Sequence, residues 1–240
     1  MGDQKRPTRP TPGTPCISAS VLAADPAALG AEVARAESAG VDRFHVDVMD
    51  GFYVPNLALT PHHVAALRRH TSLPIDLHLE VQHPDQILET IPCQGAATII
   101  VQLDTLQEPS STFRQIRSAG AAVGLAFNPA EDLSRVRPWL PDLDMLVVMA
   151  VEPGFAGQYL HPGAFDRLTR AAQMRAEAGL TFAIALDGGV STGNAARLIA
   201  AGADTLIAGT ALFGAADMRS AVQALKASPA PARPARRQGG

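Results

Sequence analysis

Short apolar segments alternate with helix-like segments eight times along the chain, and this alternation constrains the fold more than any other feature. The apolar segments have the length of strands and lie at 16–22, 43–48, 75–80, 98–102, 122–127, 144–149, 182–186 and 205–208. Strict alternation of strand and helix favours a parallel sheet. Eight such units in 240 residues match a closed (β/α)8 TIM barrel, which typically has about 250 residues. We therefore predict an α/β fold with one barrel.

The segment after the first strand decides between a barrel and an open, doubly wound sheet. A doubly wound sheet normally has a glycine-rich first turn, whereas residues 20–25 read SVLAAD, without glycine. We expect the first helix to begin at Asp25-Pro26, with Asp25 as its N-cap, and to end before Gly40. The sequence thus favours the barrel.

The two ends of the chain differ in composition from its body. Residues 1–14 and 227–240 are rich in proline and basic residues and are predicted to be disordered tails of a barrel domain at 15–226. Although the whole chain has a net charge of −3, residues 15–225 carry a net charge of −9. An acidic body argues against nucleic acid as a partner.

Other features of the composition narrow the location and the chemistry. No apolar run of about 18 residues predicts a membrane span, and no apolar segment follows the basic N-terminus, so we expect a cytoplasmic protein. The cysteines, Cys16 and Cys93, are too few for a disulfide framework and are expected to be reduced. The lysines are Lys5 and Lys226, in or beside the tails. This placement excludes a Schiff-base aldolase and barrels that use a strand-end Asp-x-Lys pair.

Polar side chains stand at the carboxyl ends of several predicted strands. In the segment 44–56, FHVDVMDGFYVPN, His45, Asp47 and Met49 alternate onto one face. His78, Asp187 and Ser20 occupy corresponding positions on other strands. Because strand ends converge at one mouth of a barrel, two imidazoles and two carboxylates could meet there. This mixed set suits one divalent metal ion such as zinc, iron(II), cobalt or manganese.

Glycines follow the last three predicted strands. They lie in Gly154–Gly157, in Gly188-Gly189 and in Gly209-Thr210. In barrels, the loops after the seventh and eighth strands commonly bind phosphate through backbone N–H groups. The sequence therefore predicts a phosphate site, with turn glycines as the alternative.

The chain resembles the ribulose-phosphate 3-epimerase family over about residues 15–215. The matching segments carry the strand-end residues and the glycine loops; they read ISASVL from Ile17, HVDVMDG from His45 with VPN from Val54, DLHL from Asp76, VMAVEPGF from Val148 with GQ from Gly157, and DGGV from Asp187.

The resemblance implies roles for these residues. His45, Asp47, His78 and Asp187 would bind the metal, and Asp47 and Asp187 would also act as the acid–base pair. The remaining matches would contact substrate; they are Ser20, His78, Met49, Met149, Gly154, Phe155, Ala156, Gly157, Gly188, Gly189, Gly209 and Thr210. The implied reaction interconverts D-ribulose 5-phosphate and D-xylulose 5-phosphate in the pentose phosphate pathway, and the family suggests a homo-oligomer.

Three positions depart from the family pattern. Glu80 stands where methionine is usual, Gln102 where histidine is frequent, and Ala156 where glycine is common. Glu80 adds a negative charge near the expected metal and could be a further ligand, bind water or a substrate hydroxyl, or swing out as a solvated carboxylate. Two alternatives to the pentulose-phosphate epimerase therefore stay open: an epimerase of a hexulose phosphate such as D-allulose 6-phosphate, and a weakly active or non-catalytic sugar-phosphate-binding protein.

Overall fold

A computed structural model describes residues 15–91, 93 and 95–227. The eight strands form one closed barrel in sequence order, and every neighbouring pair is parallel. The strands are β1 (Cys16–Ser20), β2 (Arg43–Met49), β3 (Ile75–Glu80), β4 (Thr98–Gln102), β5 (Ala122–Phe127), β6 (Met145–Met149), β7 (Ala183–Asp187) and β8 (Thr205–Ala208). The predicted TIM barrel is confirmed.

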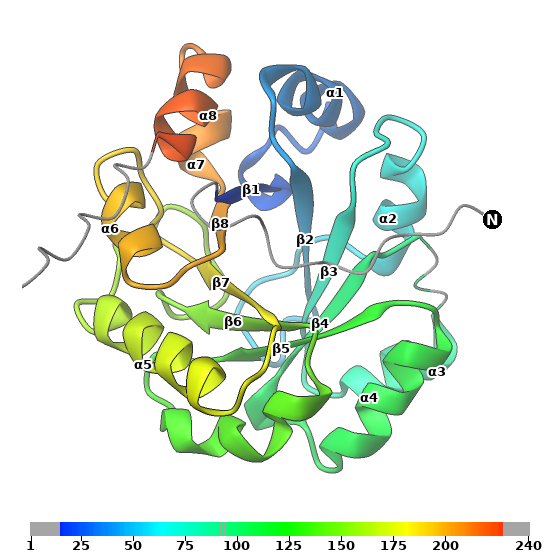
Figure 1. The fold of residues 1–240 in the computed structure, drawn as a ribbon. Coiled ribbons are helices and arrows are strands. Elements are labelled where there is room, and N and C mark those ends of the chain that lie inside the picture. Colours follow the sequence, from blue (N-terminus) through cyan, green and yellow to red (C-terminus); the bar gives the residue numbers. More distant parts are fainter. Residues whose placement is uncertain (1–14, 92, 94, 228–240) are drawn as a thin grey trace, which may run out of the picture.

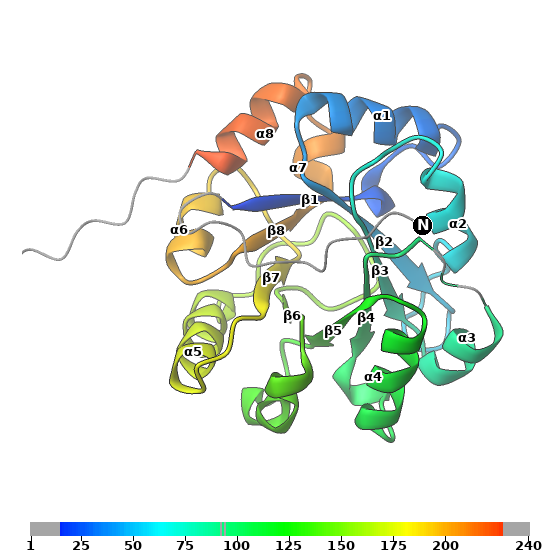
Figure 2. The same cartoon turned by 45° about the vertical axis from the view of Figure 1, so that its right-hand side comes forward.

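Helices form a ring around the strands (Figures 1 and 2). The α-helices are α1 (Leu29–Ala39), α2 (Pro61–Leu67), α3 (Pro84–Thr90), α4 (Pro109–Ser118), α5 (Ala164–Glu177), α6 (Ala195–Ala200), α7 (Thr210–Phe213) and α8 (Met218–Lys226). Three 3-10 helices complete the described elements: η1 (Val21–Ala23), η2 (Leu103–Thr105) and η3 (Leu133–Asp142). A proline begins each of α2, α3 and α4, the position where its missing N–H costs no helical bond.

The prediction for the start of the first helix is wrong. Asp25 accepts a hydrogen bond from the backbone N–H of Ala27 at 2.9 Å, and its carbonyl accepts one from Ala28. These local bonds form a turn, so α1 begins only at Leu29, with Ala28 at the N-cap. The helical segment before β6 is the 3-10 helix η3, which contains Pro138 and Pro141.

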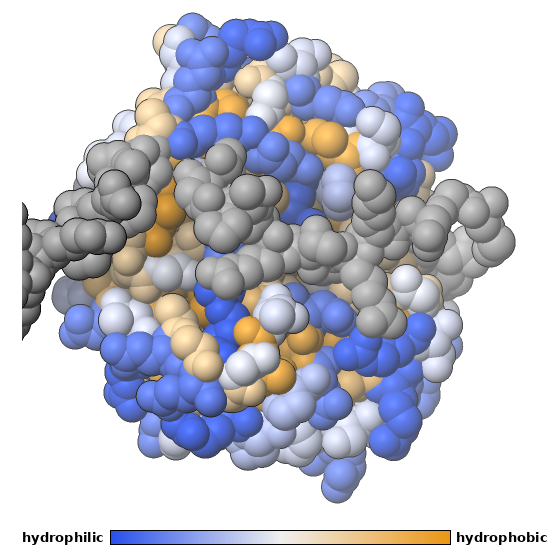
Figure 3. All heavy atoms as spheres, viewed as in Figure 1, coloured by the Kyte–Doolittle hydropathy of each residue, from blue (hydrophilic) through white to orange (hydrophobic). Residues whose placement is uncertain are grey.

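The main hydrophobic core lies between the barrel and its helices. Outward-facing strand residues such as Phe44, Val46, Leu77 and Ile99 are fully buried there. Alternation along each strand then sends the intervening residues into the barrel. On the face shown in Figure 3, hydrophilic residues dominate the periphery and hydrophobic ones lie mostly nearer the centre. The helices thus present their polar sides outward.

The structure describes the two cysteines but not the predicted tails. The predicted tail at 1–14 and residues 228–240 of the second tail lie outside the described residues. Cys16 and Cys93 are both free thiols. Within the described ranges, none of the helices combines the length and apolar character that a membrane crossing requires.

Candidate active site

The register between β2 and β3 places the first polar residues side by side. All seven residues of β2 are buried, and Asp47 pairs with His78 while Met49 pairs with Glu80. Neighbours in register point to the same side of a sheet, so these four side chains enter the barrel together. The sequence pattern HVDVM is therefore what delivers His45 and Asp47 to the mouth.

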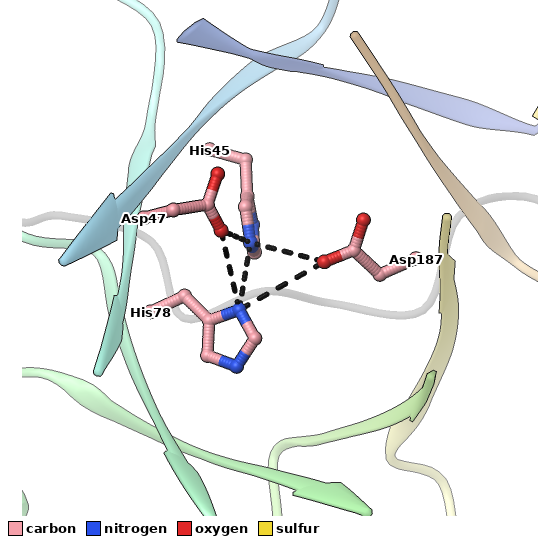
Figure 4. A group of neighbouring side chains, drawn as sticks. All are labelled: His45, Asp47, His78 and Asp187. Atoms are coloured by element: carbon pink, nitrogen blue, oxygen red, sulfur yellow. Dashed lines mark hydrogen bonds and ion pairs between the residues drawn. The ribbon is translucent and has the colours of Figure 1, made fainter. Parts of the chain in front are cut away.

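Four side chains converge inside the barrel (Figure 4). His45 Nε2 lies 3.1 Å from Asp47 Oδ1 and 3.6 Å from Asp187 Oδ2. His78 Nδ1 lies 3.1 Å from His45 Nε2, 3.4 Å from Asp47 Oδ1 and 3.8 Å from Asp187 Oδ2. Asp187 comes from β7, across the barrel from β2, so the two aspartates approach from opposite sides.

This group fits a divalent cation. One donor atom from each of the four residues lies within 4.8 Å of all the others. Two donors at about 2.0–2.1 Å from one zinc ion stand roughly 3–3.5 Å apart, which is close to the separations found here. Two imidazole nitrogens aimed at each other beside two carboxylate oxygens are also the donor types that such ions bind.

The same contacts shift the proton affinities of the group. Burial opposes a charge on His45, but the carboxylates of Asp47 and Asp187 raise its pKa to about 9. Burial would also raise the pKa of Asp47, yet the imidazoles of His45 and His78 lower it well below its usual value. The pKa of Asp187 is raised, chiefly by burial and also by the charge of Asp47. The pKa values of the two aspartates are thus shifted in opposite directions, as an acid–base pair requires.

Ser20 fixes the orientation of Asp47. Its hydroxyl donates a 2.9 Å hydrogen bond to Asp47 Oδ2, which leaves Oδ1 facing the two histidines. Ser20 ends β1, and β1 pairs with β2 so that Ser20 lies opposite His45. Ser20 therefore holds the Asp47 carboxylate in place in addition to lining the pocket.

A pocket of about 580 Å³, its open mouth included, lies above the group of four. It brings together all the predicted substrate-contacting residues except His78, which is fully buried beneath. Sequence reasoning did not assign seven further lining residues: Leu22, Val151, Glu152, Pro153, Gln158, Val190 and Ile207. Most of them neighbour a predicted residue along the chain, and that adjacency is the signal that could have found them.

Gly188 and Gly189 have backbone conformations that residues with a Cβ rarely adopt. Both have positive φ, +102° and +66°, where a Cβ causes strain. A Cβ on Gly189 would also lie 2.5 Å from the backbone nitrogen of Leu160. The loop after β7 therefore packs directly against the loop after β6, and both line the pocket.

Glu80 is buried, with only 2 % of its surface exposed, which contradicts one of its alternatives, the solvated carboxylate. Its Oε1 lies 3.9 Å from His78 Nδ1, and its Oε2 has no hydrogen-bond partner. Burial, together with the charges of Asp47 and Asp187, raises the pKa of Glu80 to about 9. Glu80 lines the pocket beside the group of four.

Two other contacts involve residues to which the sequence assigned no role. Asn56 donates a 2.7 Å hydrogen bond to the carbonyl of Gly154 and so joins the loops after β2 and β6. Gln102 lies 3.1 Å from His78 Nε2 through its amide nitrogen. Asn56 belongs to the VPN segment that matches the family, and Gln102 departs from the family pattern. Either feature of the sequence could have indicated a role for these residues.

A closed (β/α)8 barrel with a two-histidine, two-aspartate group under a glycine-bordered pocket defines a class of barrel enzymes that can bind a divalent metal ion. The model of the ribulose-phosphate 3 epimerase family matches residues 16–213. The chain belongs to this family, whose members are isomerases.

Curated relatives agree with the family match. The chain is 40% identical over 218 residues to the chloroplastic ribulose-5-phosphate-3-epimerase of Arabidopsis thaliana, covering 90% of this chain and 78% of the relative. It is 36% identical to ribulose-phosphate 3-epimerase of Escherichia coli K12, covering 88% and 94%. The resemblance seen in the sequence is confirmed.

Solved structures support the fold at lower identity. A 3-hexulose-6-phosphate synthase from Salmonella typhimurium matches with a TM-score of 0.64 and 19% identity, covering 88% of this chain and 96% of that one. KGPDC from Streptococcus mutans matches with a TM-score of 0.65 and 14% identity, covering 89% and 96%. At such identity, these similarities show the shared barrel alone.

Proposed function

We propose that this protein inverts carbon 3 of D-ribulose 5-phosphate to give D-xylulose 5-phosphate, a reaction of the pentose phosphate pathway. The observation that carries the proposal is the placement of Asp47 and Asp187. Their carboxylates point toward each other from opposite sides of the barrel, with the two histidines between them (Figure 4), and both line the pocket. Inversion by two residues needs a base on one face of the carbon and an acid on the other.

Each aspartate has a distinct task in this mechanism. One carboxylate removes the proton from carbon 3, next to the ketone, and the opposite one returns a proton to the other face. A divalent ion held by His45, Asp47, His78 and Asp187 would supply stabilisation of the negative charge that develops on the substrate oxygen. Ser20 would hold the orientation of the Asp47 carboxylate through their hydrogen bond.

The rest of the pocket would hold the substrate. Backbone N–H groups of the loops at 154–157, 188–189 and 209–210 would bind the phosphate, since glycine lets oxygen atoms approach closely. Met49 and Met149 would line the sugar with weakly polar sulfur. Both methionines face the pocket.

Isotope exchange tests the proposal directly. Protein loaded in turn with zinc, iron(II), cobalt and manganese is incubated with D-ribulose 5-phosphate in D2O. We expect deuterium at carbon 3 together with D-xylulose 5-phosphate, and loss of both after chelation. Absence of exchange with every metal would contradict the proposal and favour a non-catalytic sugar-phosphate-binding protein.

A hexulose phosphate is the second candidate substrate, and the unpartnered Oε2 of Glu80 in the pocket favours it. A buried oxygen without a partner is costly, and an additional substrate hydroxyl could donate to it. We propose that Glu80 alters rate, metal choice or substrate preference. Glu80→Met and the isosteric Glu80→Gln are compared on pentulose and hexulose phosphates; unchanged kinetics and metal content would remove this role.

Location and assembly remain predictions for this chain. The acidic body and the family resemblance favour a cytoplasmic homo-oligomer without nucleic-acid or membrane partners. Light scattering of the purified protein measures the assembly, and a monomer at micromolar concentration would contradict that prediction.

A further inference from the structure

Among the described residues that line the pocket, none has a cationic side chain that could hold a phosphate group. The lining does include four carboxylates, which repel a phosphate; they belong to Asp47, Glu80, Glu152 and Asp187. Phosphate binding therefore depends on the backbone, and on whether each peptide unit turns its N–H or its C=O toward the anion.

Two side-chain amides outside the lining hold carbonyl groups of the glycine loops. Asn56, in the loop after β2, donates from Nδ2 to the carbonyl of Gly154 at 2.7 Å. Asn194, at the N-cap of α6, donates from Nδ2 to the carbonyl of Gly189 at 2.8 Å. Both glycines line the pocket, whereas neither asparagine does. The two carbonyl groups are thus directed at side chains outside the pocket lining.

The backbone partners fix which end of each amide is the nitrogen. A carbonyl oxygen can only accept a hydrogen bond, so the amide atom beside it must belong to the NH2 group. In Asn194 the other end of the amide agrees, because Oδ1 accepts from the backbone N–H of Ser191 at 2.9 Å. Neither contact to a carbonyl depends on the protonation of a side chain.

Each held carbonyl also sets the direction of the next N–H group. The described part of the chain has no cis peptide bond, and in a planar trans peptide the C=O of one residue and the N–H of the next point in opposite directions. Holding the carbonyls of Gly154 and Gly189 outward therefore turns the N–H groups of Phe155 and Val190 toward the pocket, which both residues line. Within the described residues, neither N–H donates to another protein group.

Glycine makes such a restraint necessary. Because it lacks a Cβ, the peptide unit that follows it can adopt either orientation, and the wrong one would present a carbonyl oxygen to the phosphate. We propose that Asn56 and Asn194 are positioning residues for phosphate recognition, which hold the two glycine carbonyls outward so that the N–H groups of the next residues face the phosphate.

This inference rests on the phosphate site of the proposed function, but its test needs no turnover. Inorganic phosphate is the probe, and metal is removed by chelation so that the anion cannot bind to an ion. Phosphate binding as described without any deuterium exchange would contradict the proposed reaction alone. Normal exchange together with failure of the two tests below would overturn this inference alone.

Proton–nitrogen NMR spectra of the native chain test the direction of the two N–H groups. We expect the amide proton resonances of Phe155 and Val190 to move to lower field as phosphate is added, because each proton enters a hydrogen bond to a charged oxygen. If neither resonance responds at saturating phosphate, the inference is overturned. This result does not depend on the folding of any variant.

Leucine variants test the two asparagines. Asn56→Leu and Asn194→Leu keep nearly the same size and remove the donor without adding charge. We expect the dissociation constant for phosphate, measured by phosphorus NMR titration, to rise about tenfold in each, the effect of losing one hydrogen bond to a charged group.

Asn128→Leu is the matched control. Asn128 also joins segments at the mouth of the barrel, but it donates to side chains, Tyr53 Oη at 2.7 Å and Asp104 Oδ2 at 2.9 Å. Its phosphate affinity should match that of the native chain. Native-like binding by either Asn56→Leu or Asn194→Leu would overturn the inference. Equal weakening in Asn128→Leu would also overturn it, because that result would show a general loosening of the loops.

Discussion

The two halves of the barrel interior differ in kind. Strands β1 to β4 contribute mostly buried polar groups; these are Ser18, Ser20, Arg43, His45, Asp47, Asp76, His78, Glu80, Thr98 and Gln102. Strands β5 to β8, with Ile100 of β4, contribute an apolar cluster; it contains Ile100, Ala126, Met145, Val147, Met149, Ala183, Ala185 and Ile207. The polar half holds most of the buried polar groups, whereas the apolar half supplies packing and contributes Asp187 and the glycine loops to the pocket.

Asp47 and Asp187 show what the difference does. Asp47 stands in the polar half, where Ser20 and the two histidines stabilise its charge, and its pKa is lowered. Asp187 extends from the apolar half, where burial and the charge of Asp47 raise its pKa more than the imidazoles of His45 and His78 lower it. Identical side chains therefore acquire opposite tendencies from the half of the barrel that carries them.

The largest expected effect comes from neutralising the base of the polar half. Asp47→Asn keeps shape but cannot accept the proton, so we expect turnover to fall by about 10²–10⁴-fold, the usual contribution of general acid–base catalysis. Turnover is measured on protein whose metal content is verified. Near-normal turnover of the metal-loaded variant would refute the two-aspartate mechanism.

The second prediction concerns a buried ion pair of the polar half, Arg43 with Asp76, which lies outside the group of four metal-binding candidates. Arg43 Nε donates to Asp76 Oδ2 at 2.7 Å, and Arg43 also contacts Thr98. Arg43→Met leaves Asp76 buried and unpaired, so we expect the free energy of unfolding to drop by about 3–5 kcal/mol. Urea denaturation measures the loss.

The double variant Arg43→Met/Asp76→Leu is the control for this prediction. It removes both charges, and much of the lost stability should return. Equal destabilisation of the single and double variants would mean that packing, rather than an uncompensated charge, accounts for the effect.

The smallest effect is expected in the apolar half. Ile100→Val removes one buried methylene at a fully buried position, and the free energy of unfolding should fall by about 0.5–1.5 kcal/mol. Zinc affinity should stay unchanged, because Ile100 contributes no donor. A tenfold change in affinity would show that the two halves are coupled.

The sequence predicted the barrel and most of the residues that meet at its mouth, because strand periodicity and strand ends are local patterns. It missed the start of α1, where the hydrogen bond of the Asp25 side chain to Ala27 competes with the helix. It also left Gln102 without a role. Contacts between strands that are distant in sequence depend on register, and a single chain does not display register.

The hydrogen bond from Asn56 to Gly154 has an energetic consequence. It joins the loop after β2 to the loop after β6, which borders the pocket, and Tyr53 of the first loop also bonds to Asp104 at 2.9 Å. Segments already held to one another lose little conformational freedom when a ligand arrives. The entropy of ordering these loops is therefore spent during folding, and more of the contact energy with a small sugar phosphate remains for affinity and rate.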